Sequence, residues 1–193
     1  MKGRRRPIIE PRIPMFLGCE GESEQGYGTL IARLLIESRE SVYLRAELLR
    51  PGGGDPLALV ECAIERIAQA RKTRGTVYAV RGVLLDSDTR GVSQIRDQQA
   101  VTLADENGIM LIWQDPCFEA VLLRHLDGCH ALRPQTCAIA MTELRRRWPD
   151  YAKGLPAADL ARRISRMEIE RCAGVESELA AFLRAVGFLA RSE

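Results

Sequence analysis

Apolar and polar residues follow two alternating patterns along the first two thirds of the chain. Four short segments are mostly apolar, as in strands buried between layers of helices: residues 13–19, 42–49, 75–86 and 109–113. Between them, apolar residues recur at the spacing of one helix face, in residues 23–35, 57–71 and 93–107. Strands that alternate with amphipathic helices predict crossover connections and a mainly parallel sheet. We therefore expect an α/β, Rossmann-like fold with helices flanking the sheet.

The last third of the chain has a helical pattern, and helices are predicted over residues 118–126, 142–148, 156–172 and 176–189. Ser23 is the expected N-cap of the first helix of the chain. The Gly- and Pro-rich segment 51–56 predicts a loop, which lacks the Lys and Ser/Thr of a P-loop. The expected organisation has three parts: a flexible basic N-terminus at residues 1–10, an α/β core at residues 11–130, and a helical C-terminal extension at residues 131–193 that packs on the core.

Composition is that of an ordinary globular protein. Of the 193 residues, 46% are hydrophobic and 28% are charged, and the net charge is +2. This apolar content supports a folded core and excludes a wholly disordered chain. No segment is apolar over the length of a membrane span, and the start of the chain lacks the apolar run of a secretory signal. We therefore expect a cytoplasmic protein with no membrane partner.

The six cysteines are expected to be reduced thiols, because disulfides are rare in the cytoplasm. Most lie among apolar residues, which favours a packing role. Cys129, His130 and Cys137 form the one cluster that hints at zinc. The cluster lacks a Cys-x-x-Cys pair, so packing is the preferred interpretation.

Acidic residues follow three of the predicted strands: Glu20 follows the first, Asp86 and Asp88 the third, and Asp115 and Glu119 the fourth. In a parallel sheet, ligands bind at the carboxyl ends of the strands, so these carboxylates are expected to share one crevice. Crowded carboxylates stay ionised only with a cation among them, and magnesium prefers oxygen ligands. Each motif alone also fits a helix cap or a turn. Together, in this order, they favour a metal site that polarises a phosphoryl oxygen and activates water.

Two family resemblances rest on these residues. Glu20-Gly21 after one strand and Asp86-Ser87-Asp88 after another resemble the Toprim pattern of topoisomerases, primases and several nucleases. The match is closer to the RloB-like family, which is associated with abortive phage resistance. The segment 19–24 with Tyr27 resembles the opening motif of that family. Its Asn-Pro-Cys-Phe-Glu segment is matched by residues 115–119, with Asp115 in place of Asn, and its Tyr-x-Lys element by Tyr151 and Lys153. A tryptophan that the family carries soon after this glutamate corresponds here to Val121.

The resemblance implies roles for individual residues. Glu20, Asp86 and Asp88 would be the core ligands of Mg²⁺ or Mn²⁺, and Glu20 could also act as a general acid/base. Glu24 could join a second metal ion, although a first-turn glutamate favoured by the helix dipole is an equal alternative. Glu119 would be a further metal ligand, or simply a carboxylate at the start of a helix.

Three further predictions concern basic residues. Lys153 would offset charge in the transition state, with an exposed surface lysine as the alternative. The arginine run Arg145, Arg146 and Arg147 would bind the phosphate backbone of nucleic acid, and the alternative is a solvated helix face. His125 lies on an apolar helix face and is predicted to be structural, while His130 has no assigned partner.

The function predicted from these features is metal-dependent hydrolysis of phosphodiesters in DNA or RNA, in anti-phage defence. One alternative is a non-catalytic sensor or partner subunit of a defence complex that retains the Toprim fold. Another is a nucleotidyl transferase of the primase type, although the chain is short for one. The expected partners are nucleic acid, a defence-system protein and a second copy of the chain.

Overall fold

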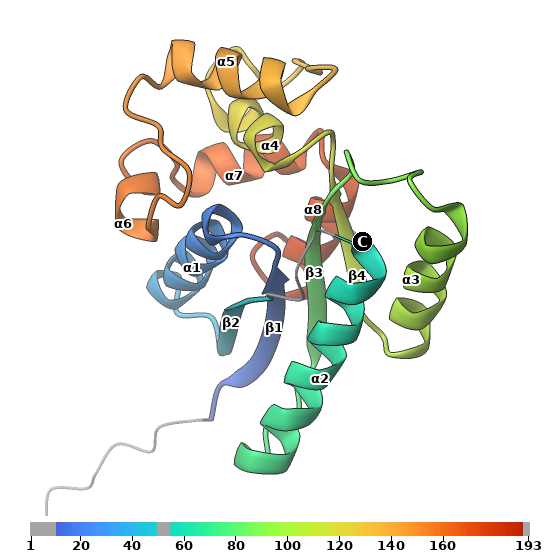
Figure 1. Cartoon of the computed structure of the whole chain (residues 1–193). Coiled ribbons are helices and arrows are strands. Elements are labelled where there is room, and N and C mark those ends of the chain that lie inside the picture. Colours follow the sequence, from blue (N-terminus) through green and yellow to red (C-terminus); the bar gives the residue numbers. More distant parts are fainter. Residues whose placement is uncertain (1–10, 50–54, 191–193) are drawn as a thin grey trace, which may run out of the picture.

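The computed structural model describes residues 11–49 and 55–190, and the predicted flexible N-terminus and most of the predicted 51–56 loop lie outside this part. Four strands form one sheet, and all neighbouring strands are parallel: β1 (Ile13–Cys19), β2 (Val42–Leu48), β3 (Val80–Asp86) and β4 (Met110–Gln114). The strand order is β2-β1-β3-β4. The predicted α/β fold with a Rossmann-like parallel sheet is confirmed (Figure 1).

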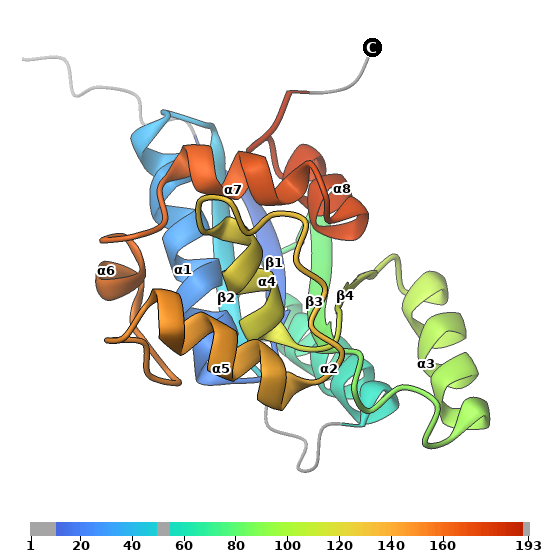
Figure 2. The same cartoon turned by 90° about the horizontal axis from the view of Figure 1, so that it is seen from above.

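Eight helices accompany the sheet in the described part of the chain: α1 (Glu22–Glu37), α2 (Pro56–Arg74), α3 (Gln94–Glu106), α4 (Phe118–His125), α5 (Cys137–Arg147), α6 (Ala157–Leu160), α7 (Arg166–Ala173) and α8 (Ser177–Ala185). α2 and α3 lie on one side of the sheet, and α1 lies on the other side with α7 and α8 (Figure 2). α4 and α5 lie beyond the carboxyl ends of the strands (Figure 1). Helices therefore cover both faces, which explains the nearly continuous apolar strands.

Alternate side chains of the strands enter two separate cores. In β1, Leu17 packs with the apolar residues of α1, α4, α7 and α8, whereas Phe16 packs with those of α2 and α3. Both side chains are fully buried. Side chains two residues apart in a strand point to the same face, so β1, β3 and β4 each serve both cores at once.

The third strand is shorter than predicted. The apolar pattern indicated residues 75–86, but β3 begins at Val80. Gly75 ends α2 in the left-handed conformation, with φ of 64°. Residues 76–79 then lead the chain back to the sheet, where the Ala79 N–H donates to the Pro14 carbonyl at 2.9 Å. Helices commonly end at a glycine in this conformation. Residues 75–79, which were predicted to belong to the strand, therefore form the helix end and a connection instead.

Two helix predictions were wrong in detail. Gly21, not Ser23, is the N-cap of α1, because the backbone becomes helical at Glu22. The single helix predicted over residues 156–172 is divided into α6 and α7. Ser165 starts α7 with a capping box. The Ser165 hydroxyl accepts from backbone N–H groups of the first turn, including that of Met167, and the Glu168 carboxylate accepts from the Ser165 N–H. This cap fixes a new helix start inside a segment whose apolar spacing looked continuous.

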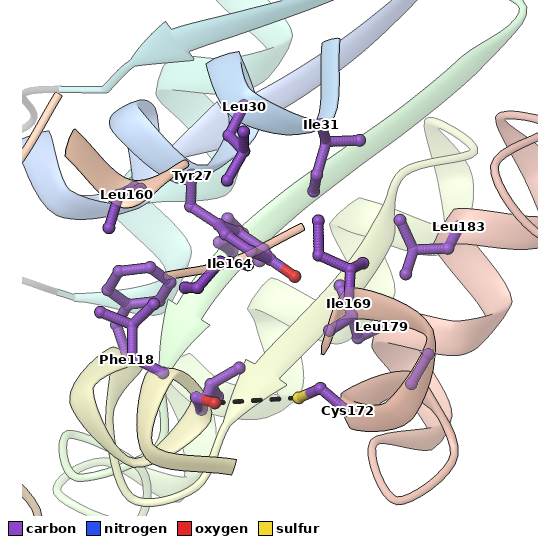
Figure 3. Close-up of a cluster of buried hydrophobic side chains, with 14 of the residues drawn as sticks. Tyr27, Leu30, Ile31, Phe118, Leu160, Ile164, Ile169, Cys172, Leu179 and Leu183 are labelled. Carbon is purple, nitrogen blue, oxygen red and sulfur yellow. Dashed lines mark hydrogen bonds between the residues drawn. The ribbon is translucent and has the colours of Figure 1, made fainter. Parts of the chain in front are cut away.

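The larger core lies between the sheet and helices α1, α4, α7 and α8. Tyr27 and Leu30 from α1 face Phe118 from α4 and Ile169 from α7 (Figure 3). At its edge, the Cys172 thiol donates to a backbone carbonyl of α4 at 3.8 Å, the dashed line in Figure 3. The structure thus joins the C-terminal helices and the sheet through one continuous apolar cluster.

His125 is a structural residue, as predicted. Its imidazole is fully buried, with Nε2 at 2.9 Å from the Tyr27 hydroxyl and Nδ1 at 2.8 Å from the Val121 carbonyl. Burial is the main cause that lowers the pKa of His125 to about 4. The ring is therefore neutral and satisfied at both nitrogens, and it joins α1 to α4.

Arg124 is a fully buried arginine that sequence patterns did not indicate. Its guanidinium pairs with the Glu176 carboxylate and donates to the Asp115 carbonyl at 2.9 Å and the Leu132 carbonyl at 3.4 Å. These contacts connect α4 with the segments before α4, after α4 and before α8. Two of its nitrogens donate to backbone carbonyls and Nε lies against the Glu176 carboxylate, which offsets much of the cost of burying this charge.

Candidate acidic site

Strand pairing brings the two main acidic motifs together. β1 and β3 are neighbours, with Gly18 paired to Val83, so both strands finish at the same edge of the sheet. Glu20 follows β1, and Asp86 is the last residue of β3. The Asp86 N–H donates to the Glu20 carboxylate at 3.3 Å. The predicted meeting of these two residues, which are far apart in sequence, is confirmed.

A cavity of about 370 Å³ opens at this edge of the sheet. Five carboxylate residues line it, namely Glu20, Glu22, Glu24, Asp86 and Glu119, and Gly21, Ser23, Lys153 and Gly154 complete the wall. The carboxylates come from the end of β1, the first turn of α1, the end of β3 and the first turn of α4. Three stretches that lie far apart in the chain, residues 20–24, Asp86 and Glu119, thus supply acidic groups to one cavity.

Glu24 is buried at the base of the cavity, with only 5% of its surface exposed. Gly21 allows this position, because a Cβ at residue 21 would lie 2.8 Å from the Glu24 Oε2. Burial, with the charges of Glu20 and Glu119 adding to it, raises the pKa of Glu24 to about 7. The alternative of an exposed first-turn glutamate is therefore wrong for Glu24.

Asp86 has the most perturbed carboxyl group of the site. Burial raises its pKa to about 8, with further contributions from the charges of Glu24 and Glu20. The Phe118 N–H donates to Asp86 Oδ1 at 2.9 Å and partly opposes this effect. Burial also raises the pKa of Glu20, and the neighbouring Asp88 adds to that rise. A cluster with these pKa values needs protons or a cation to offset its charge near neutral pH.

The segment 151–154 closes the cavity on the side of α1 and α4. The Tyr151 hydroxyl donates to Glu119 at 3.3 Å, and the Lys153 ammonium lies 3.3 Å from the same carboxylate. The Gly154 N–H donates to the Ser23 hydroxyl at 2.8 Å. Ser23 is therefore a tether between α1 and this segment rather than a helix cap. Lys153 stays 71% exposed, so its charge is available at the mouth of the cavity.

Asp88 is near the cavity but does not line it. Its Oδ2 accepts a hydrogen bond from the Cys137 thiol at 3.1 Å. Cys137 begins α5, and its side chain packs with Cys117 and Ala140. The sequence offered no signal for this contact, because the two residues are 49 positions apart.

The arginine run lies at the C-terminal end of α5 and does not line the acidic cavity. Arg145 and Arg146 are exposed, and Arg147 is half-buried. Arg146 and Arg147 both pair with Glu143, one turn earlier on the helix. Only part of the positive charge of this run is thus available to an external anion.

None of the six cysteines forms a disulfide, and four of them are buried. Cys129 is buried, whereas His130 is exposed in the loop after α4, where they form no zinc cluster with Cys137. The packing interpretation of the buried cysteines is therefore the better one.

The donor set of the cavity suits a hard divalent cation in kind, since it consists of carboxylate oxygens that lack enough positive partners. With the side chains in their present positions, however, no group of three or more His, Cys, Asp or Glu residues within residues 11–49 and 55–190 is close enough to hold a metal ion. Asp88 is held by Cys137, and Glu20 accepts the Asp86 N–H. A cation bound by three of these carboxylates would require side-chain rotation at the edge of the sheet.

The raised pKa values predict a pH-dependent stability. A carboxyl group whose pKa is higher in the folded protein than in the unfolded chain binds more protons when folded, so the free energy of unfolding falls as pH rises. For Asp86, this fall is expected between about pH 4 and about pH 8. Within that range, the free energy of unfolding should fall by at most about 3 kcal/mol for every two pH units. Urea unfolding of EDTA-treated protein at several pH values measures it.

Asp86→Asn should remove the part of that slope that Asp86 contributes, because the substituted side chain does not ionise, whereas Glu24 and Glu20 should keep their own contributions. Asp105→Asn, at an exposed position on α3, is the matched control and should keep it. A stability that stays constant over the whole range in the unsubstituted protein would show that the cluster is not crowded in the way described.

Fold and site together define an α/β protein with an acidic cavity at the carboxyl edge of a parallel sheet. The chain belongs to the RloB-like protein family, whose family model matches residues 15–176. This confirms the resemblance drawn from segments 19–24 and 115–119, and membership indicates a role related to phage resistance. No curated protein and no solved structure matches the chain significantly.

Within the described part of the chain, none of the helices combines the length and the apolar character that crossing a membrane requires.

Proposed function

We propose that the protein is a magnesium- or manganese-dependent nuclease with a Toprim-type active site, which cleaves phosphodiester bonds of nucleic acid in anti-phage defence. One observation carries this proposal: carboxylates from three distant stretches of the chain converge on a cavity at the carboxyl edge of the sheet. Their raised pKa values indicate a lack of positive partners. Such a set costs stability to assemble, and a function that uses the acids together explains why they converge.

Glu20, Asp86 and, after release from Cys137, Asp88 are the residues that would hold the cation, with Glu24 placed to contact a second one. A bound divalent cation would polarise the phosphoryl oxygen. It would also lower the pKa of bound water, so that a hydroxide nucleophile is available at neutral pH. Glu20 is only partly buried and has a raised pKa, so its carboxylate can accept a proton from a nucleophile.

Lys153 supplies the positive charge that the chain itself contributes to the site. Burial opposes the charged form of Lys153, but the charge and hydrogen bond of Glu119, together with neighbouring groups such as Asp86, raise its pKa. The ammonium thus stays charged at the mouth of the cavity, where it can attract the phosphate of a substrate. Tyr151 and Glu119 hold the segment that positions it. The exposed Arg145 and Arg146 would add salt-dependent contacts with the phosphate backbone.

A cleavage assay tests the proposed function. Labelled single-stranded DNA, double-stranded DNA and RNA are incubated with the purified protein in the presence of Mg²⁺ or Mn²⁺. We expect endonucleolytic products from at least one substrate, and we expect EDTA to abolish them because the proposed activation of water depends on the bound cation. A product yield that EDTA does not change would contradict the role given to the cation.

The second candidate is a non-catalytic sensor or partner subunit of a defence complex. It is favoured by the absence, in the described residues, of three acidic or other ligating side chains already close enough to hold a metal. A magnesium titration separates the two candidates. The nuclease proposal expects Mg²⁺ at millimolar levels to raise the thermal stability, since the cation would offset the crowded carboxylates, and expects Asp86→Asn to reduce that gain. No change in stability would favour the non-catalytic module.

A further inference from the structure

A second cavity lies at the opposite end of the sheet from the acidic site. It has a volume of about 220 Å³ and lies between α2, the start of β3 and the segment that joins α3 to β4. Its lining includes two arginines, Arg71 and Arg81, and no acidic residue. Arg81 lies near the start of β3 and Asp86 at its end, which places about 16 Å of strand between the two cavities.

Arg81 is a half-buried cation without a carboxylate partner in the described part of the chain. Its Nη1 donates to the Asn107 carbonyl at 2.7 Å, at the end of α3. Its Nε is buried and has no hydrogen-bond partner. A buried donor that is left unsatisfied costs free energy, and a charged donor costs more than a neutral one. An anion in the cavity would satisfy this group.

Arg71 adds a second positive charge at the same cavity. It lies in the last turn of α2, is exposed, and has no ion pair within residues 11–49 and 55–190. Many of the other described arginines are paired with carboxylates, including Arg45, Arg66, Arg96, Arg124, Arg147 and Arg166. The cavity thus gathers two arginines that form no ion pair with any carboxylate of the described residues.

The rest of the cavity wall is mostly apolar, with Thr76 and Asn107 as its other polar residues. Ile64 and Ile67 come from α2, Tyr78 from the segment before β3, and Ile109 from the segment before β4. Tyr78 and Ile109 are almost completely buried, whereas Val77 leaves 60% of its surface exposed. Apolar walls with a few convergent polar groups are typical of small-molecule sites. An apolar cavity of about 150 Å³ holds one benzene molecule, so a cavity of about 220 Å³ has room for one ring with a charged substituent.

We propose that this cavity binds a small organic anion, in which a carboxylate or phosphate group meets Arg81 and Arg71 and an apolar body of about one ring lies against Ile67, Tyr78 and Ile109. The carboxylate and the phosphate share the chemistry that the guanidinium groups recognise, since both accept paired N–H donors. The inference is independent of the proposed nuclease activity, because it uses no residue of the acidic site.

The test is an NMR titration of ¹⁵N-labelled full-length protein with four probes at constant ionic strength. Benzoate and phenyl phosphate carry both a ring and a charge. Benzyl alcohol carries only the ring, and inorganic phosphate only the charge. We expect benzoate or phenyl phosphate to shift the amide signals of residues 76–81 and 107–109 saturably, and benzyl alcohol and inorganic phosphate to bind at least about tenfold more weakly. Whichever of the first two binds more tightly identifies the anionic group.

Arg71→Gln is the decisive variant, because residue 71 is exposed and the change leaves the core intact. It should weaken binding of the preferred probe about tenfold, as expected for the loss of one charged hydrogen-bonding group. Arg74→Gln, at an exposed arginine three residues further along α2 that does not line the cavity, should leave the affinity unchanged. The proposal is overturned if no probe gives saturable shifts at these amides, if benzyl alcohol binds as tightly as the anions, or if the two variants weaken binding equally.

Discussion

The double substitution Asp86→Asn with Asp88→Asn is expected to lower nucleic-acid cleavage by at least about 100-fold while leaving the fold intact. The loss follows because both changes remove negative charge from residues proposed to hold the cation. The bound cation is expected to contribute several kcal/mol of transition-state stabilisation, which the variant would lose. The fold should persist, because an amide oxygen can still accept from the Phe118 N–H at position 86 and from the Cys137 thiol at position 88.

The measurement compares initial cleavage rates of the two proteins at equal concentration, with circular dichroism as the check on folding. Asp105→Asn is the matched control, since it removes one exposed carboxylate from α3 without contact with the cavity, and it should keep the full rate. A double variant that folds and cleaves at the rate of the unsubstituted protein would exclude Asp86 and Asp88 from the chemistry. Because Asp86→Asn also relieves crowding, the inactive variant should be at least as stable as its parent in the absence of metal.

Arg124→Met is expected to destabilise the protein by about 3–5 kcal/mol, the usual cost of removing one partner from a buried ion pair. The substitution keeps a side chain of similar length but leaves the Glu176 carboxylate without its main counter-charge. It also removes donors from the carbonyls of Asp115 and Leu132. Burial already raises the pKa of Glu176, and the unpaired carboxyl group should take up a proton more readily still.

Urea unfolding followed by fluorescence or circular dichroism measures the loss. Arg133→Gln provides the control, because Arg133 is 46% exposed and its nearest approach to Glu176 is 3.9 Å. It should change the free energy of unfolding by less than about 1 kcal/mol. Combining Arg124→Met with Glu176→Leu should recover much of the stability, since apolar replacement of a whole buried pair is often nearly neutral. An Arg124→Met loss no larger than that of Arg133→Gln would show that the pair contributes little.

Much of the fold was predictable because buried parallel strands leave a strong signal. The predicted strand at residues 13–19 coincides with β1, and the others lie within a few residues of their predicted positions. Boundaries were less accurate where a single backbone conformation or cap decides them. Gly75 removes the first residues of the predicted third strand, and Ser165 starts a helix within a continuous apolar pattern.

The acidic site was predictable to a similar degree. Residues that directly follow strands of a parallel sheet must reach the same edge, which is why Glu20 and Asp86 could be paired from the sequence. Glu24 could not be assigned in the same way, because burial depends on the packing of α1 against its neighbours. Only the structure shows that its carboxylate turns inward.

The sequence by itself determined the order of strands and helices, the acidic residues at the strand ends and the family, because each depends on local pattern or on motifs of neighbouring residues. Only the tertiary structure decided which distant groups meet. It placed Asp88 against Cys137, Gly154 against Ser23, and Arg124 against Glu176. These contacts join segments separated by long stretches of chain, and their formation depends on how helices pack on the sheet. No local pattern predicts that packing, which also places Arg71 and Arg81 at one cavity whose lining contains no acidic residue.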